Sequence, residues 1–84
     1  MLENLDLKEI INREKEDEIY SISCDILRAL VILYGSAWHS ELLFTLNELW
    51  SLKGINLDKR VEKEKMLDKA LELLSSKGII NYEK

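Results

Sequence analysis

The sequence has no proline and no glutamine, and its 84 residues include only three glycines, one cysteine and one histidine. Proline and glycine interrupt or end helices, so a chain this poor in both favours long helices with few joints. With Cys24 alone, an internal disulfide cannot form and a four-cysteine zinc site is excluded. The lack of glutamine, beside abundant glutamate, lysine, leucine and isoleucine, is typical of thermophile proteins.

Long apolar runs are also missing. No run approaches the roughly 18–20 residues of a membrane span, and the first residues are acidic and amphipathic rather than a signal-peptide core. We therefore expect a cytoplasmic protein with no membrane partner. A chain of this length that is 46% hydrophobic and 33% charged predicts one packed domain with a modest core.

Residues that commonly carry catalysis are scarce. His39 has no second histidine or cysteine at a metal-ligand spacing, and metal and acid–base sites need several convergent groups. Cys24 falls on an apolar helical stripe, which predicts a buried thiol rather than a reactive one. Neither Gly35 nor Gly78 belongs to a glycine-rich phosphate loop. We expect no catalytic residue, metal site or cofactor, and no enzymatic activity.

The N-terminal part, residues 1–17, is expected to form a short helix and a charged linker. Asp6 and Glu9 have the spacing of a capping box, which predicts a helix over about residues 6–13. Residues 13–18 are all charged and are interpreted as a solvated segment. The remaining residues, 18–82, are expected to form the core of the single domain.

From Glu18 to Tyr34 two adjacent apolar stripes repeat at helical spacing. Their width predicts a helix buried over a broad arc at the centre of the core. Alternatively, the second stripe is a dimer surface rather than core. Trp38, at the start of the next helix, is interpreted either as core packing or as an exposed aromatic anchor at an interface. With it, the candidate interface residues are Tyr20, Leu27, Val31, Tyr34 and Trp38.

Two more helices are predicted. One runs from about residue 37 or 41 to Lys53, ends at Gly54 and buries Trp50 with its leucines. The other runs over about residues 59–76 with Asp58 as its N-cap; its first half is almost entirely charged and its second half is rich in leucine. Residues 79–82 then read as a short strand.

This order of elements is similar to the winged helix-turn-helix proteins of microbial transcription regulators. The residues that carry the resemblance are Ile26–Gly35, Leu46–Leu49, Gly54–Ile55 and Leu67–Ile80. It implies a mainly α fold: a winged-helix-like three-helix core with an extra N-terminal helix and a short C-terminal β-strand as a reduced or missing wing.

In that class, the helix after the Gly-Ile turn enters the major groove with its N-terminal part. The resemblance therefore implies a DNA-binding transcriptional regulator, acting as a homodimer on double-stranded DNA, with the helix of residues 58–76 reading the duplex. The implied DNA-binding residues are Lys59, Arg60, Lys63 and Lys65.

Two features favour an alternative function. The chain ends at Lys84, soon after the first strand of the expected wing, and Glu62 and Glu64 interleave with the basic residues. Residues 1–50 carry ten acidic and four basic side chains, in a chain of net charge −4. A mixed-charge surface on an acidic protein suits a protein partner, whose charges would fix the register. The alternative is a winged-helix-like protein–protein interaction module with no nucleic-acid role.

Overall fold

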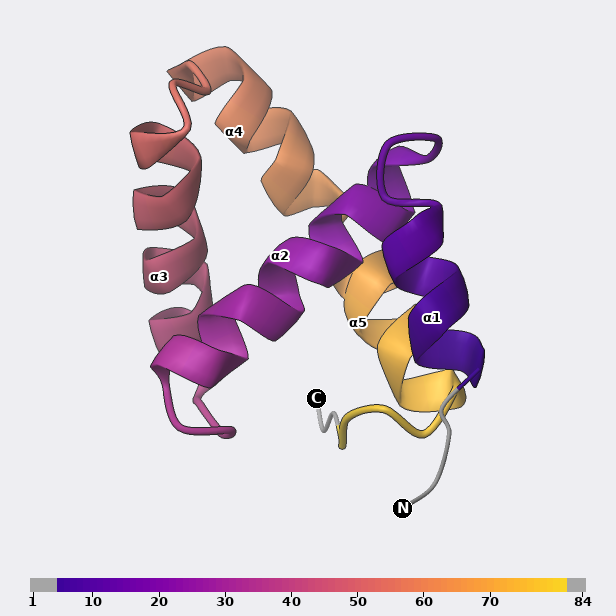
Figure 1. Ribbon diagram of the computed structural model, residues 1–84. Coiled ribbons are helices and arrows are strands. Elements are labelled where there is room, and N and C mark those ends of the chain that lie inside the picture. The colour runs from indigo at the N-terminus through magenta and orange to yellow at the C-terminus, as the bar shows by residue number, and fades with distance from the viewer. Residues whose placement is uncertain (1–4, 82–84) are drawn as a thin grey trace.

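The computed structural model describes the backbone of residues 5–81 and the side chains of residues 7–81. It is mainly helical, as predicted (Figure 1). The helices are α1 (Leu5–Asn12), α2 (Glu18–Ile32), α3 (His39–Leu52), α4 (Leu57–Lys65) and α5 (Leu67–Ser76). Within residues 5–81, no helix combines the length and the apolar character that crossing a membrane requires.

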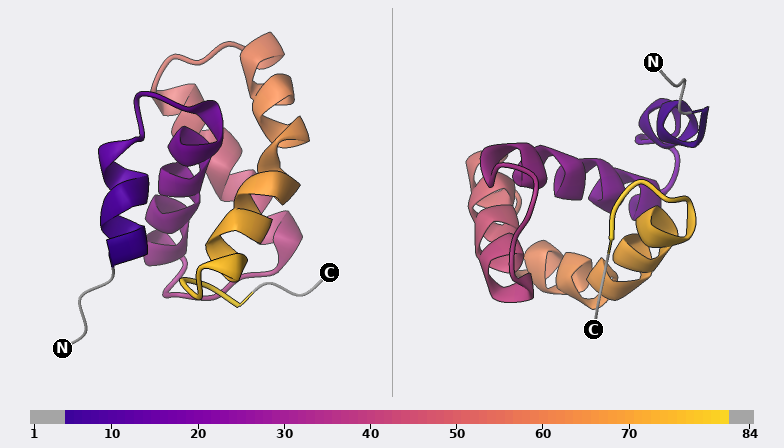
Figure 2. Two further views of the ribbon diagram at one scale, coloured as in Figure 1. Left: turned by 90° about the vertical axis from the view of Figure 1, so that its right-hand side faces the viewer. Right: turned by 90° about the horizontal axis from the view of Figure 1, so that it is seen from below.

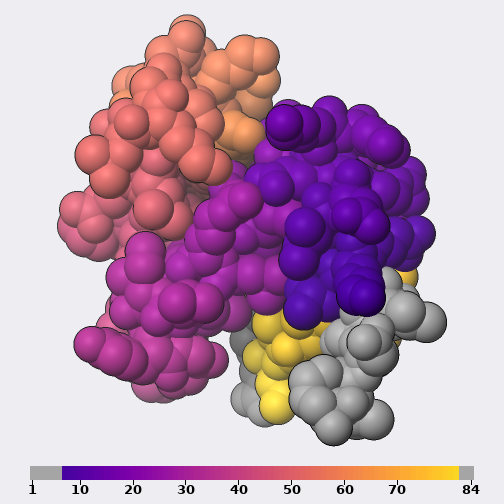
Figure 3. Space-filling view, in the orientation of Figure 1, coloured from indigo at the N-terminus to yellow at the C-terminus, as the bar shows by residue number. Residues whose placement is uncertain are grey.

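Helix α2 is the centre of the fold, and it packs against α1, α3 and α5. Seen from below, α2, α3 and the α4–α5 pair form the sides of a frame, and α1 lies outside one corner of it (Figure 2). In the space-filling view, α2 crosses the front of the molecule between α3 and α1 (Figure 3). The broad buried arc predicted for this segment is confirmed, because its buried residues are Ile22, Ser23, Cys24, Asp25, Ile26 and Ala29.

Side-chain hydrogen bonds cap the starts of α2 and α4. Asp17 caps α2 by accepting a bond from the Ile19 amide at 2.8 Å. Asn56, not Asp58 as predicted, caps α4, and its side-chain oxygen lies 2.9 Å from the Lys59 amide. The side-chain oxygen of an N-cap asparagine satisfies an otherwise free amide at this position. The predicted capping aspartate, Asp6, has a side chain outside the described residues.

The single helix predicted over residues 58–76 is wrong in one respect, because it is interrupted at Met66. This residue lies at φ −96° and ψ −2°, and its amide bonds to the carbonyl of Lys63, three residues back, at 3.1 Å. That tighter bond breaks the α-helical ladder between α4 and α5. Helix α5 buries Leu67, Ala70, Leu71 and Leu74, whereas none of the nine residues of α4 is buried.

The predicted C-terminal strand is not formed over residues 79–81, and Tyr82 lies outside the described residues. A glycine cap replaces it: Gly78 adopts φ 73°, and the Ile79 amide bonds to the Leu74 carbonyl at 3.0 Å. This turn folds Ile79 and Ile80 back against the core. The two isoleucines are therefore buried partly by a helix cap rather than by strand pairing.

The turn after α2 contains a backbone outlier. Tyr34 has φ 62° and is 97% exposed, and Gly35 follows at φ 92°. A left-handed conformation costs an ordinary residue roughly 1–2 kcal/mol, and an exposed side chain recovers little of it by packing.

We expect Tyr34→Asn to raise the free energy of unfolding by about 0.5–1 kcal/mol, because asparagine tolerates the left-handed region better than tyrosine. Urea denaturation followed by circular dichroism would measure the change. Tyr34→Phe keeps the backbone cost and serves as the matched control, with no expected change. An asparagine variant that is less stable than the phenylalanine variant would contradict the assignment of strain to Tyr34.

Candidate functional site

The four predicted DNA-binding residues do not form one surface. Lys59 and Lys65 are exposed, but they are six residues apart and point about 120° away from each other around the helix axis. Arg60 is half-buried, and its Nε atom is buried with no hydrogen-bond partner in the structure. Lys63 points inward. The structure therefore leaves only two of the four side chains free to approach a duplex.

Lys63 is held inside the frame by two contacts. Its side chain is 12% exposed, and its Nζ atom pairs with the carboxylate of Glu18 at the start of α2. The same Nζ lies 5.8 Å from the centre of the Trp50 ring, which is a cation–π distance. Glu64 also turns toward α3, where it accepts a bond from the Asn47 amide group at 3.4 Å. Helix α4 is thus attached to α2 and α3 by polar contacts.

The two apolar residues of α4 are left largely exposed. Leu57 is 64% exposed and Val61 is 43% exposed. An amphipathic helix on a globular core normally buries its apolar stripe and exposes its charges. In α4 the apolar residues are instead exposed, and the half-buried positions are occupied by Arg60 and Lys63.

A buried carboxylate organises the other side of the frame. Asp25, in the middle of α2, is 1% exposed and accepts three bonds: from Trp50 Nε1 at 2.9 Å, Lys53 Nζ at 2.8 Å and an Arg28 nitrogen at 2.9 Å. Arg28 also binds both oxygens of Glu14, at 2.8 and 3.1 Å. These five residues, called here the Asp25 cluster, connect the α1–α2 linker, α2 and α3.

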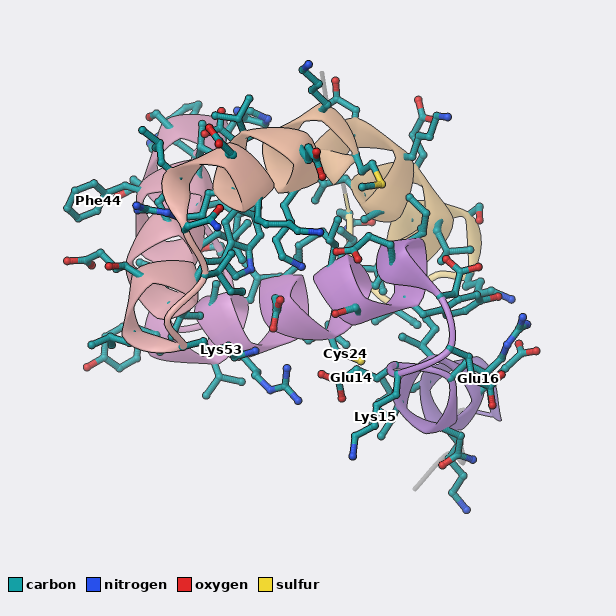
Figure 4. The ribbon with its side chains drawn as sticks, turned by 90° about the horizontal axis from the view of Figure 1, so that it is seen from above. Glu14, Lys15, Glu16, Cys24, Phe44 and Lys53 are labelled. Carbon is teal, nitrogen blue, oxygen red and sulfur yellow. The ribbon has the colours of Figure 1, made fainter. Side chains whose placement is uncertain are left out.

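Electrostatics within the Asp25 cluster follow from these bonds. The hydrogen bonds from Arg28 hold the pKa of Glu14 below its ordinary value of 4.5, and they raise the pKa of Arg28. Cys24 lies nearby, and burial raises the pKa of its thiol, which points at the Ile10 carbonyl 3.6 Å away. The cysteine is buried, as predicted. In Figure 4, Glu14, Cys24 and Lys53 lie along the same side of α2.

A set of exposed apolar side chains surrounds the α2–α3 turn and the outer face of α3. We call this set the apolar surface; its members are Val31, Ile32, Tyr34, Trp38, Phe44 and Leu52. Ile32 and Leu52 line one shallow groove between α2 and α3, together with Thr45, Glu48, Leu49 and Ser51. Phe44 is one helical turn before Glu48, on the rim of that groove, and projects away from the frame (Figure 4).

The predicted interface residues divide into two groups. Tyr20 and Leu27 are packed against the core, and the Tyr20 ring is covered by the Arg13 guanidinium at 4.6 Å. Val31, Tyr34 and Trp38 are 78%, 97% and 79% exposed. The predicted stripe therefore belongs to the core at its N-terminal end and to the surface at its C-terminal end. On α3, Trp50 is fully buried, as predicted.

His39 does not join a metal-ligating group. Its Nε2 atom lies 3.8 Å from an Asp68 oxygen, and both side chains are more than half exposed. Among the described residues, no three histidine, cysteine or acidic side chains are placed to hold a metal ion.

Sequence reasoning missed the Asp25 cluster and the groove residues Ile32, Phe44 and Leu52. One signal for the cluster was present: Asp25 stands between Ile22, Ile26 and Ala29 on the core-facing arc, where an unpaired carboxylate would be costly. The groove left a weaker signal, since Phe44 and Leu52 lie off the main leucine stripe of α3.

No protein-family model, curated protein or solved structure matches this chain.

We expect Glu14→Gln to lower the free energy of unfolding by about 0.5–1 kcal/mol at pH 7, the usual size for a partly exposed ion pair. Because the folded-state pKa of Glu14 is lowered, its contribution is complete above pH 4.5 and is lost as the pH falls through the folded-state value. Urea denaturation of both proteins from pH 7 to pH 3 would measure this.

The two stability curves should therefore converge at acidic pH. Glu16→Gln is the matched control, because Glu16 is 69% exposed and lies 3.7 Å from Arg13; it should change stability little at any pH. A constant difference between Glu14→Gln and the parent protein across this range would show that Glu14 does not act through its charge.

Proposed function

We propose that this protein is a protein-interaction module that binds its partner through the apolar surface. The main support is the number of large exposed apolar side chains along the α2–α3 pair, with Ile32 and Leu52 in a common groove. Single exposed apolar residues are ordinary, but several of them on two neighbouring helices, with aromatic residues among them, are typical of an interface.

The backbone at Tyr34 supports the same proposal. This residue combines a left-handed conformation with 97% exposure, so it adds little to the stability of the isolated chain. Trp38, 79% exposed, lies four residues further on, at the start of α3. Tyrosine and tryptophan contribute disproportionately to binding energy when a partner buries them. A strained, exposed aromatic residue beside a second one is consistent with selection for binding rather than for folding.

The rigid base of this surface is the Asp25 cluster. Trp50 and Lys53, near the end of α3, are fixed to Asp25 in the middle of α2. The groove lies one to two turns away on the same two helices, so its walls are held at a defined separation. A preformed groove reduces the ordering that association would otherwise require.

A photo-crosslinking residue placed at Phe44, in cells that produce the protein, tests the proposal. We expect a discrete crosslinked product with another protein, and we expect Leu52→Glu to reduce its yield by about tenfold, because a charge in the groove removes a buried apolar contact. The product would be measured by gel shift and mass spectrometry.

The same crosslinking residue at Glu16, which is exposed on the α1–α2 linker, is the control and should give no such product. Circular dichroism would confirm that Leu52→Glu folds, since Leu52 is 85% exposed. A product at Phe44 that Leu52→Glu leaves unchanged would rule out the groove as the binding site.

We retain duplex DNA binding by a winged-helix-like regulator as a second candidate. One observation favours it: Lys59 and Lys65 are exposed on α4, the helix that the resemblance assigns to the major groove. Against it, Lys63 is engaged with Glu18 and Trp50, and the exposed face of α4 also carries Asp58 and Glu62. This candidate would require Lys59 and Lys65 to supply most of the phosphate contacts.

If the protein binds duplex DNA, its affinity should fall steeply with salt, and Lys59→Ala or Lys65→Ala should each reduce the slope of log K against log salt by about 0.9. Fluorescence anisotropy with a labelled duplex would measure it. Lys63→Ala is the matched control and should leave the slope unchanged, because this lysine is internal. No binding at roughly 50 mM salt would eliminate this candidate.

A further inference from the structure

The groove between α2 and α3 has a wall formed by one ridge of α3. Thr45, Glu48 and Leu52 line the groove, and Glu41 stands one turn before Thr45 on the same helix. The spacing of four, three and four residues keeps this row on one side of an α-helix, and all four positions lie within the uninterrupted helix α3. The ridge therefore places one carboxylate in the groove and a second one two turns away.

The negative charge of this ridge is not neutralised by the chain itself. Glu48 is exposed, and no basic side chain among residues 7–81 pairs with it. The carboxylate of Glu41 accepts a bond from the Trp38 amide at 2.9 Å, which leaves its charge without a cationic partner in the described part of the chain. The basic side chains beside the groove, Arg28 and Lys53, are both bound to Asp25. The groove thus combines apolar walls with uncompensated negative charge.

These properties define the shape and the charge of an occupant. No strand forms over residues 5–81, so within that range a partner finds no sheet edge to extend. A shallow apolar groove between two helices suits the apolar face of an amphipathic helix, with anchors three or four residues apart. Uncompensated carboxylates attract basic side chains at the edge of that face, and they repel nucleic-acid phosphates and anionic membrane surfaces.

From the apolar groove and its unpaired carboxylate, we propose that the partner contributes a basic amphipathic helix from another protein. Its apolar residues enter the groove, and a lysine or arginine lies over Glu48. The aliphatic stem of that residue packs along Phe44 or Leu52, each one turn from Glu48, while its charged end reaches the carboxylate. This inference rests on the proposed function and adds the secondary structure and the charge of the partner.

The groove is shallow, so a single short helix should bind weakly. The few apolar anchors that it accepts place the dissociation constant of an isolated peptide on the order of 0.1 mM. An ion pair at the edge of an interface is screened by salt, so binding should weaken between roughly 0.05 and 0.5 M salt. The measurement therefore belongs at low salt and at high peptide concentration.

Two synthetic peptides of about 15 residues test the proposal. They share leucines at helical spacing and differ only at the flanking positions, which carry lysine in one peptide and glutamate in the other. In a titration of the full chain followed by nuclear magnetic resonance, the lysine peptide should bind at least tenfold more tightly than the glutamate peptide. It should shift the backbone amide signals of Ile32, Thr45 and Leu52, which line the groove.

Charge reversal in the groove gives the decisive comparison. Glu48→Lys should weaken binding of the lysine peptide by about tenfold and strengthen binding of the glutamate peptide. Glu62→Lys is the matched control: it changes the net charge equally, lies on α4 outside the groove, and should leave both affinities nearly unchanged. Both side chains are exposed, and circular dichroism would verify that each variant folds.

The proposal is overturned if neither peptide binds at about 1 mM, if both bind equally, or if Glu62→Lys weakens binding as much as Glu48→Lys does. Sedimentation that shows a dimer of the parent chain, abolished by Leu52→Glu, would make a second copy the occupant and would also overturn it. The proposed function is tested separately by crosslinking from Phe44. A crosslinked product together with equal binding of both peptides would keep the interface and reject the basic helix.

Discussion

The carboxylate of Asp25 is the interaction on which the arrangement of helices depends. It lies almost without solvent in the middle of α2, and its three bonds go to residues on α2 and α3. A buried carboxylate is tolerated only when its oxygens are satisfied, so α3 can pack on α2 in the register that brings Trp50 Nε1 and Lys53 Nζ to it, and not one turn away. Leucines alone would permit several registers, because their contacts are not directional.

The consequences of that register extend to both ends of the frame. Trp50, fixed by Asp25, presents its ring to Lys63 of α4. In the other direction, the same pairing sets the distance between Ile32 and Leu52 and thereby the groove. The apolar surface and the outward face of α4 are thus different surfaces of one frame. The apolar surface carries exposed aromatic and aliphatic side chains, whereas the outward face of α4 carries mainly charged side chains. The two surfaces therefore suit different binding partners.

Periodicity in the sequence was enough to predict the core. The broad arc of α2, the burial of Trp50 and Cys24, and the leucine-rich packing of α5 all follow from apolar residues at helical spacing. The orientation of α4 could not be predicted in this way. Its segment holds only two apolar residues, and the ion pair of Lys63 with Glu18, 45 residues away, decides which side faces inward. Such a contact is invisible to a local pattern.

The predictions of a C-terminal strand and of one continuous last helix were wrong for a related reason. Ile79 and Ile80 have the composition of a strand, but the left-handed turn at Gly78 brings the Ile79 amide to the carbonyl of Leu74, where it forms a helix-cap bond instead. The interruption at Met66 could not be predicted from the sequence, because no proline or glycine lies near it. Val31, Tyr34 and Trp38 were named from the sequence as candidate interface residues, and their side chains are exposed. The groove could not be named in the same way, because it depends on how two helices meet.

The polar attachment of α4 also determines how the protein fluctuates. A helix in which no residue is buried can detach without exposing core leucines. Among the described residues, detachment breaks one ion pair, one cation–π contact and one amide–carboxylate bond to the rest of the frame. Its amide protons should therefore exchange with solvent through openings far less costly than global unfolding, while those of α2 exchange only when the whole domain opens. Among the residues that the structure describes, the ion pair of Lys63 with Glu18 joins α4, where we expect the fastest exchange, to α2, where we expect the slowest.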